Sequence, residues 1–433
     1  MTTELSNFAA RLRETICSFS NVGDDVRSLA LQNRQLSEPP HVSCCENELN
    51  ALAIELFTLQ FRSNVAYRKI CEARGSIPNV IEHWAQIPAV PASAFKELDL
   101  TCLAPAERTA VFHSSGTTEQ KPSRHFHNAE SLAVYEASLW PWFEQNFFDS
   151  SKFKMQNSKL VILTPPPVQT PHSSLVHMFE TIRRKLGAAE AAFVGKISDD
   201  GIWTLDFDAT LAVLDGNSKS KTQNPKLILG TAFSFVHLLD YLAKKDLCFD
   251  LPAGSRVMET GGYKNRSRSM PKTELHRLIT EQFGVPAENI ICEYGMSELS
   301  SQAYDLGAQA SRRRVFPGAT KELGGETSGL PESIVHHFHF PPWAKVRIIS
   351  PETGGEVADG KTGLIRVFDL ANVFSVMAIQ TEDLGIRRDD EFELIGRATL
   401  AEPRGCSLMM LVGSASSLPR SKWGIDKTMP SKK

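Results

Sequence analysis

The spacing of apolar residues divides the chain into a mainly helical first part and a longer part in which strands and helices alternate. Residues 1–100 have the helical pattern, and the clearest predicted helix covers residues 47–72. Its near-3.6 period is carried by Leu49, Leu52, Ala53, Leu56, Leu59 and Gln60. The pattern ends at Pro88 and Pro91, because a proline disfavours helix in the residue before it.

Residues 101–335 are expected to form an α/β core. Short apolar runs at 160–163, 227–230 and 289–292 predict strands, and helices are predicted over 131–143 and 272–283. Short strands that are apolar throughout and separated by helices indicate a sheet buried on both faces, with largely parallel strands. We therefore expect an α/β fold with flanking helices.

A β-rich subdomain is expected over residues 336–412. Strands are predicted at 336–340, 346–349, 363–368 and 392–395, with a turn cluster of Pro, Thr and Gly at 351–355. Residues 413–433 are rich in Ser, Pro and Lys and show no periodicity, so we expect a disordered tail.

Charge and composition exclude several classes of protein. A net charge of −3 gives no electrostatic footprint for nucleic acid or an anionic membrane. No apolar run approaches the roughly 18–20 residues that span a bilayer, and the N-terminus does not resemble a signal peptide. The eight cysteines include no C-x-x-C pair, which indicates reduced thiols and a cytoplasmic location.

A loop rich in hydroxyl groups follows the strand predicted at 110–112. Backbone amides and hydroxyls around a glycine form a nest suited to a triphosphate, and Lys121 would add positive charge. The residues of this loop are Ser114, Ser115, Gly116, Thr117 and Thr118. The alternative is a solvated Ser/Thr turn, since short motifs recur by chance.

The run Glu-Tyr-Gly-Met-Ser-Glu at 293–298, directly after a predicted strand, is the most informative motif. Tyr294 can present its ring to a purine, and Glu298 can hold Mg²⁺, which prefers carboxylate and phosphate oxygens. Gly295 and Ser297 complete the predicted nucleotide site. The alternative is a turn at the end of a strand with a surface Glu.

Four further residues fit a bound nucleotide. Gly261 and Gly262 would let the backbone approach a flat ligand closely. Asp383 can accept hydrogen bonds from both ribose hydroxyls, and Arg397 can reach ribose or phosphate. The alternatives are a β-turn for the glycines, an Asp turn and a surface Arg.

Cys406 is the candidate nucleophile. The neighbouring Arg404 can lower the pKa of its thiol, and a thiolate can accept an acyl group as a thioester. The alternative is an inert cysteine that is buried as a small apolar side chain.

Together these motifs resemble the acyl-protein synthetases of bacterial bioluminescence operons (LuxE-type) and, more distantly, the phenylacetate–CoA ligases of the adenylate-forming superfamily. The resemblance covers roughly residues 45–412. It is carried by Ser114 to Thr118, Thr164-Pro165, Ser173-Ser174-Leu175, Gly261-Gly262, the run 293–302, Pro341-Pro342-Trp343, the run 381–385, Gly396-Arg397-Ala398 and the run 404–408.

The resemblance implies the core fold of an adenylate-forming enzyme and a two-step reaction that uses ATP and Mg²⁺. A fatty carboxylate and ATP would give acyl-AMP and pyrophosphate, and a thiol would then displace AMP. It also implies stacking of Tyr294 on adenine, Mg²⁺ at Glu298 and ribose at Asp383. By motif position the acceptor thiol would be Cys406, and the partner an acyl-acceptor protein such as a fatty acyl reductase or a carrier protein.

The chain departs from the superfamily pattern at three places. Glu119 and Gln120 stand between Thr118 and Lys121, and the ribose motif is Thr-Glu-Asp instead of Thr-Gly-Asp. Only the 36 residues 398–433 follow Arg397, whereas a full mobile C-terminal domain needs about a hundred. We therefore expect a truncated C-terminal domain and an acyl-protein synthetase. The alternatives are an acid–thiol ligase that forms acyl-CoA or loads a carrier protein, and an inactive nucleotide-binding scaffold.

Overall fold

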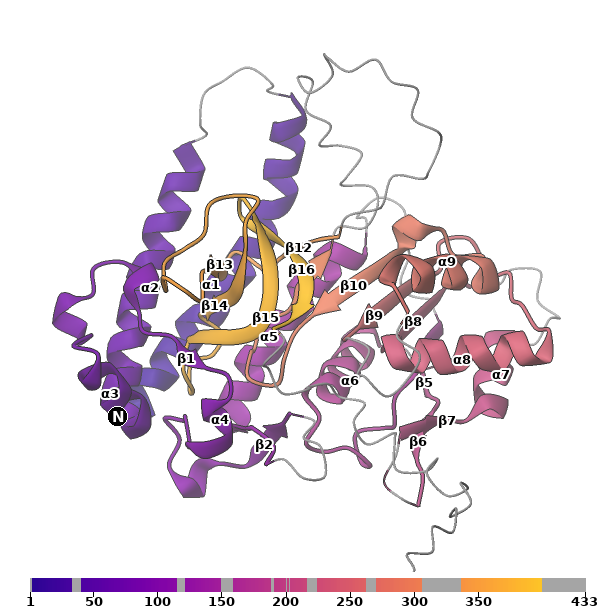
Figure 1. Cartoon of the computed structure of the whole chain (residues 1–433), viewed down its shortest axis with the longest axis horizontal. Helices are drawn as coiled ribbons and strands as arrows, with labels where there is room; N and C mark the ends of the chain where they lie inside the picture. Colours follow the sequence, from indigo (N-terminus) through magenta and orange to yellow (C-terminus); the bar gives the residue numbers. More distant parts are fainter. Residues whose placement is uncertain are drawn as a thin grey trace, which may run out of the picture.

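The computed structural model shows a layer of N-terminal helices beside a large mixed sheet that other helices cover (Figure 1). The residues described by the structure are 2–32, 40–114, 121–148, 159–187, 191–199, 201, 203–215, 224–261, 270–305 and 336–398.

One twelve-stranded sheet joins the α/β part to the strands near the C-terminus. Its strands are β1 (Val90–Pro91), β4 (Lys159–Ile162), β5 (Ala191–Phe193), β8 (Lys226–Thr231), β9 (Arg256–Thr260), β10 (Ile290–Tyr294), β11 (Ala303–Asp305), β12 (His337–His339), β13 (Ala344–Ile349), β14 (Thr362–Asp369), β15 (Ala378–Arg388) and β16 (Glu391–Arg397). Their order is β13-β14-β15-β16-β12-β11-β10-β9-β8-β4-β5, and β1 pairs with β15.

The sheet has a parallel half and an antiparallel half. Strands β5, β4, β8, β9 and β10 run parallel to one another. From β10 onward the neighbours β11, β12, β16, β15, β14 and β13 are antiparallel. The prediction of short buried parallel strands between helices is therefore confirmed. The mixed α/β class is confirmed with it.

Helices cover both faces of the parallel half. The helices are α1 (Thr2–Gln32), α2 (Pro40–Ser63), α3 (Val65–Ala73), α4 (Ala94–Glu97), α5 (Ala129–Phe147), α6 (Ser174–Leu186), α7 (Phe207–Asp215), α8 (Ala232–Lys245) and α9 (Lys272–Phe283). Strand β4 shows how the faces divide, since successive side chains point to opposite sides. Leu160 and Ile162 pack in the core that contains α5 and α6, whereas Val161 packs in the core of α7, α8 and α9.

Side-chain caps set where several helices begin. Asn128 accepts a hydrogen bond from Ser131 N at the start of α5, and Ser173 accepts one from Val176 N at the start of α6. Thr231, the last residue of β8, caps α8 in the same way. Each cap satisfies a backbone amide that the first helical turn leaves without a partner.

Two short hairpins complete the fold. Strands β2 (Ala110–His113) and β3 (Arg124–His127) pair with each other, as do β6 (Gly195–Ile197) and β7 (Trp203–Leu205). Single 3-10 turns occur at η1 (Pro78–Val80), η2 (Trp84–Gln86), η3 (Pro105–Glu107) and η5 (Ala287–Asn289).

The structure corrects the predicted helix over residues 47–72. The helix ends at Ser63, and a second one begins at Val65, because Asn64 adopts an extended conformation and caps α3 by accepting a hydrogen bond from Tyr67 N. Asn64 is fully buried, and its amide also donates to Ser375 O at 3.4 Å. Apolar periodicity could not show this break, since the apolar spacing continues through it.

Candidate functional site

The motif at residues 293–298, called the central motif below, lies at the carboxyl edge of the parallel strands. Glu293 and Tyr294 end β10, and Thr260 ends the neighbouring β9, where it pairs in register with Glu293. Gly261 follows with φ +81, a left-handed conformation that glycine adopts without strain. In open α/β sheets, ligands bind in the crevice outside the carboxyl ends of the strands.

The structure brings three predicted residues into direct contact. The Tyr294 hydroxyl donates to Asp383 Oδ2 at 3.0 Å, and Arg397 Nε lies 3.5 Å from Asp383 Oδ1. Asp383 and Arg397 are register partners on β15 and β16, so strand pairing holds them side by side. Arg397 also donates to Glu382 Oε2 at 2.7 Å. The result is a cluster of carboxylates, a guanidinium and a phenol at one place.

Tyr294 is held in this cluster by other aromatic rings. Phe338, Phe340 and Phe392 contact its ring edge-to-face, with centroids 5.4–6.3 Å away. The side chain is 7% exposed. Such packing fixes the direction of the hydroxyl, and therefore the position of Asp383 relative to β10.

Glu298 is completely buried, four residues beyond the end of β10. His125 of β3 lies next to this segment, and its Nδ1–H donates to the carbonyl of Ser297 at 2.9 Å. Burial lowers the pKa of His125, while the Ser297 carbonyl and the charge of Glu298 oppose that shift. A neutral imidazole is therefore favoured beside a buried carboxylate.

The predicted phosphate loop connects the two strands of a hairpin. Ser114 Oγ accepts a hydrogen bond from Ser123 N at 3.0 Å and so continues the pairing of β2 with β3 by one rung. Lys121 forms an ion pair with Glu97 at 3.2 Å, and both side chains are exposed. Exposed pairs of this kind contribute little to stability, so Lys121 can exchange this partner for another anion.

Five residues of the predicted binding loops and the predicted nucleophile lie outside the described residues. They are Ser115, Gly116, Thr117, Thr118, Gly262 and Cys406.

The carboxyl group of Glu293, the residue before Tyr294, is buried. Burial raises the pKa of Glu293 from 4.5 to about 7, although the Thr260 hydroxyl, which donates to Glu293 Oε2, opposes the shift. A Cβ at Gly295 would lie 2.3 Å from Glu293 Oε1. Glycine at position 295 thus leaves room for this carboxyl, and a larger residue there would force the carboxyl to shift.

An ionic network lies on the same side of the sheet as Cys292. Lys272 Nζ lies 3.5 Å from Glu259 Oε1 and 2.5 Å from Cys292 Sγ, and His276 Nε2 lies 3.3 Å from the same Glu259 oxygen. Burial would raise the pKa of Glu259, but Lys272 and His276 hold it well below its ordinary value. The network thus connects α9, through Lys272 and His276, to Glu259 of β9 and Cys292 of β10.

Sequence reasoning did not identify two buried residues that contact the central motif. Asp369, the last residue of β14, and Asn372, in the connection between β14 and β15, bind the main chain at residues 298–301. The signal in the sequence is an Asp at the end of an apolar strand, followed three residues later by an Asn. That pattern also occurs in ordinary turns, so it does not identify a site on its own.

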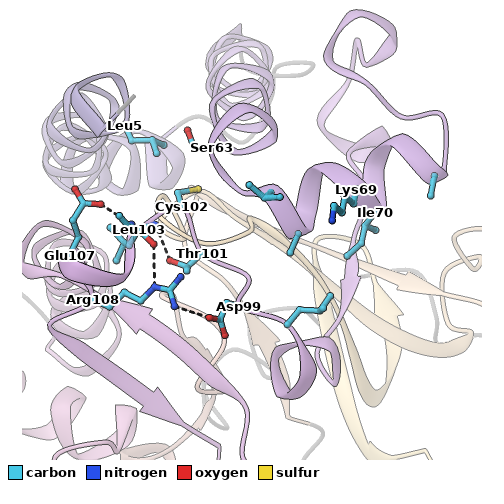
Figure 2. Close-up of a pocket in the computed structure, with 15 residues that line it drawn as sticks. Leu5, Ser63, Lys69, Ile70, Asp99, Thr101, Cys102, Leu103, Glu107 and Arg108 are labelled. Atoms are coloured by element: carbon cyan, nitrogen blue, oxygen red, sulfur yellow. Dashed lines mark hydrogen bonds and ion pairs between the residues drawn. The ribbon is translucent and has the colours of Figure 1, made fainter.

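A cavity of about 930 Å³ lies away from these residues, between α1, α3 and the segment 98–108 (Figure 2). Lys69 and Cys102 line it, and the ion pair of Arg108 with Asp99, at 2.7 Å, lies at one side. None of the described residues predicted to bind nucleotide lines this cavity.

Within the described ranges, no helix combines the length and the apolar character needed to cross a bilayer. The same ranges contain no group of three or more His, Cys, Asp or Glu side chains that could hold a metal. Mg²⁺ commonly binds through one or two carboxylates together with phosphate oxygens, so the carboxylate of Glu298 suits Mg²⁺ that arrives with a nucleotide.

Comparison with known proteins confirms the resemblance predicted from the motifs. No protein-family model matches the chain. The chain is 22% identical over 365 residues to the long-chain-fatty-acid–luciferin-component ligase of Vibrio harveyi, a match of 82% of this chain and 85% of that protein. It is 23% identical over 381 residues to the protein of the same name from Aliivibrio fischeri, with 83% and 86% covered.

Solved structures show the same fold. The crystal structure of 2-hydroxyisobutyryl-CoA ligase in complex with 2-HIB-AMP and CoA superposes with a TM-score of 0.55 and 14% identity, over 83% of this chain and 69% of the ligase. A second structure of that ligase, with 2-HIB-AMP, gives a TM-score of 0.54. The chain therefore has the core fold of an adenylate-forming ligase.

Proposed function

We propose that this protein activates a fatty carboxylic acid with ATP as acyl-AMP and transfers the acyl group to the thiol of a protein cysteine. The observation that carries the proposal is the contact between Tyr294, Asp383 and Arg397, next to the segment of Glu298, in the fold of an adenylate-forming ligase. The two relatives are named long-chain-fatty-acid–luciferin-component ligases, and these names support a long-chain fatty acid as the substrate.

In the first step, a carboxylate oxygen attacks the α-phosphorus of ATP, an O–P bond forms, and pyrophosphate leaves with the electrons of the broken bond. Asp383 can accept hydrogen bonds from the ribose hydroxyls, and Arg397 neutralises the excess negative charge beside it. Tyr294, nearly buried and braced by three phenylalanines, presents little of its ring to the adenine and holds Asp383 in place through its hydroxyl. These residues orient the nucleotide so that the two reactants meet.

Glu298 would hold Mg²⁺ that accompanies the nucleotide. The bound metal would supply neutralisation of the negative charge that develops on the phosphate oxygens. His125, kept neutral by burial, adds no competing positive charge beside the carboxylate. Ser114, Gly261 and the loop that ends at Lys121 would contact the phosphates and the base.

In the second step, a thiolate attacks the acyl carbon, the C–S bond forms, and AMP leaves. Cys406 is the proposed acceptor. The buried thiols of Cys71 and Cys292 and the half-buried thiol of Cys102 are poor nucleophiles, because removal from water raises the pKa of each.

Labelling with a radioactive long-chain acid tests the transfer. With ATP and Mg²⁺, the wild-type protein should acquire label that resists denaturation and is released by hydroxylamine, as a thioester is. Cys406→Ala should abolish this label but retain acid-dependent release of pyrophosphate. Cys248→Ala, which removes an exposed cysteine, is the matched control and should label normally. Undiminished labelling of Cys406→Ala would overturn the assignment of the acceptor.

A second candidate is an acid–thiol ligase whose acceptor is CoA or a carrier protein. The likeness of the fold to 2-hydroxyisobutyryl-CoA ligase favours it. Formation of acyl-CoA without a covalently labelled enzyme would support this candidate over acyl transfer to a protein cysteine.

A further inference from the structure

The segment that carries Glu298 is bound along its main chain by Asp369, the last residue of β14, and by Asn372 in the β14–β15 connection. Asp369 Oδ2 accepts hydrogen bonds from Ser300 N at 2.9 Å and Ser301 N at 2.8 Å, and Asp369 Oδ1 accepts from Ser301 Oγ at 2.7 Å. Asn372 Nδ2 donates to the carbonyl of Glu298 at 2.9 Å, and Asn372 Oδ1 accepts from Ser300 Oγ at 2.6 Å. These hydrogen bonds fix the backbone that carries the Glu298 side chain.

The bonds are made in the interior. Asp369 is 0% exposed and Asn372 is 1% exposed. The Asp369 carboxylate accepts hydrogen bonds from hydroxyl and amide donors, including Ala371 N at 3.0 Å. Burying a carboxylate among neutral donors costs free energy that an apolar side chain would not cost. Packing alone therefore does not explain why Asp369 stands at this position.

The same connection is held from its other side by helix α2. Gln60 Nε2 donates to the carbonyls of Asn372 at 2.7 Å and Val373 at 3.2 Å, and Gln60 Oε1 accepts from Met377 N at 3.1 Å. Gln60 therefore anchors the connection to the body of the protein. The hydrogen bonds of its side chain go to residues 372, 373 and 377 of the connection, and not to the segment 298–301.

We propose that Asp369 and Asn372 are positioning residues that set the direction of the Glu298 carboxylate for the metal–nucleotide complex. The inference rests on the proposed function, in which Glu298 holds Mg²⁺. Groups that bind a metal need supporting hydrogen bonds that fix their orientation, and buried networks supply that rigidity. Hydrogen bonds to the main chain at residues 298, 300 and 301 restrict the backbone that carries the Glu298 side chain. They therefore restrict the orientation of its carboxylate.

A matched pair of variants separates positioning from stability. Asn372→Ala and Gln60→Ala each remove a buried amide side chain that makes three hydrogen bonds. Both variants should lower the melting temperature to a similar extent. Only Asn372→Ala should weaken the Mg²⁺-dependent part of ATP binding, which calorimetry measures as the ratio of ATP affinities with and without Mg²⁺. We expect about a tenfold loss for this variant and less than about a twofold change for Gln60→Ala.

Ser300→Ala is the milder second variant, since it removes only the hydroxyl bond to Asn372. It should give a smaller loss in the same ratio, with little change in melting temperature. Equal effects of Asn372→Ala and Gln60→Ala on the ratio, or no effect of Asn372→Ala and Ser300→Ala, would overturn the inference while leaving the role of Glu298 intact. If Glu298→Gln left the ratio unchanged, the proposed metal role of Glu298 would be wrong, and the positioning role would be wrong with it.

Discussion

Glu293→Gln should make the protein more stable at alkaline pH. Burial raises the pKa of Glu293 from 4.5 to about 7, so the folded chain retains a proton that the unfolded chain has released between these values. In this window the free energy of unfolding falls as pH rises, because the folded state binds more protons than the unfolded state. Above pH 7 the full penalty of about 3 kcal/mol acts on the wild-type protein. A glutamine has the same shape and carries no such penalty.

Urea denaturation at pH 5 and at pH 8, followed by tryptophan fluorescence, measures this effect. The free energies of unfolding of the two proteins should be similar at pH 5, and the variant should be more stable at pH 8 by up to about 3 kcal/mol. Buried histidines such as His125 titrate equally in both proteins and cancel in the difference. The depressed pKa of Glu259 acts below pH 4.5, where its stabilisation is lost as pH falls, and so lies outside this window.

Glu288→Gln, at an exposed position in η5, is the control and should leave the pH dependence of stability as in the wild type. If Glu293→Gln were no more stable than the wild-type protein at pH 8, the Glu293 carboxyl would not be desolvated, and the raised pKa would be wrong.

Three further predictions concern the same region. Gly295→Ala should lower the free energy of unfolding by about 1–3 kcal/mol, because its Cβ would lie 2.3 Å from Glu293 Oε1; an unchanged urea midpoint would refute this. Tyr294→Phe removes the 3.0 Å bond to Asp383 and should weaken ATP binding about tenfold, and an unchanged affinity by calorimetry would count against this orientation of the ribose carboxylate. Lys121→Met breaks an exposed ion pair and should change stability by less than about 0.5 kcal/mol while weakening ATP binding; unaltered ATP binding would remove Lys121 from the phosphate site.

The sequence predicts the parallel half of the sheet well because its strands are apolar on both faces. The predicted runs at 160–163, 227–230 and 289–292 correspond to β4, β8 and β10 within one or two residues at each end. The helix predicted at 272–283 has the bounds of α9. A strand that is buried on both faces appears in the sequence as a continuous apolar run. Such a run can be recognised without knowing which strands lie beside it.

The antiparallel half was predicted less completely. Strand β15 (Ala378–Arg388) is the longest in the sheet and is not predicted from the sequence, although the motif with Asp383 lies within it. Its sequence mixes charged and apolar residues without a clean alternation, because Glu382, Asp383 and Arg387 are partly buried in ion pairs. Strand β3 was missed for a similar reason, since its Arg-His-Phe-His sequence buries two histidines.

In the candidate site too, some residues can be predicted from the sequence and others cannot. Motifs identified Tyr294, Asp383 and Arg397, and the structure places them in contact. Sequence reasoning could not find Asp369 and Asn372, because their role depends on hydrogen bonds to a segment about seventy residues earlier in the chain. Long-range hydrogen bonds of this kind leave no local pattern in the sequence.

Carboxylate-dependent exchange between ATP and pyrophosphate tests the central claim most directly. The purified protein would be assayed with acids that range from short aromatic to long-chain fatty, beside Glu298→Gln and Asp383→Asn. The account predicts exchange with medium-chain or long-chain fatty acids in the wild-type protein and a large loss in both variants. Absence of exchange with every acid, in a protein that binds ATP, would contradict the claim that this site forms acyl-AMP.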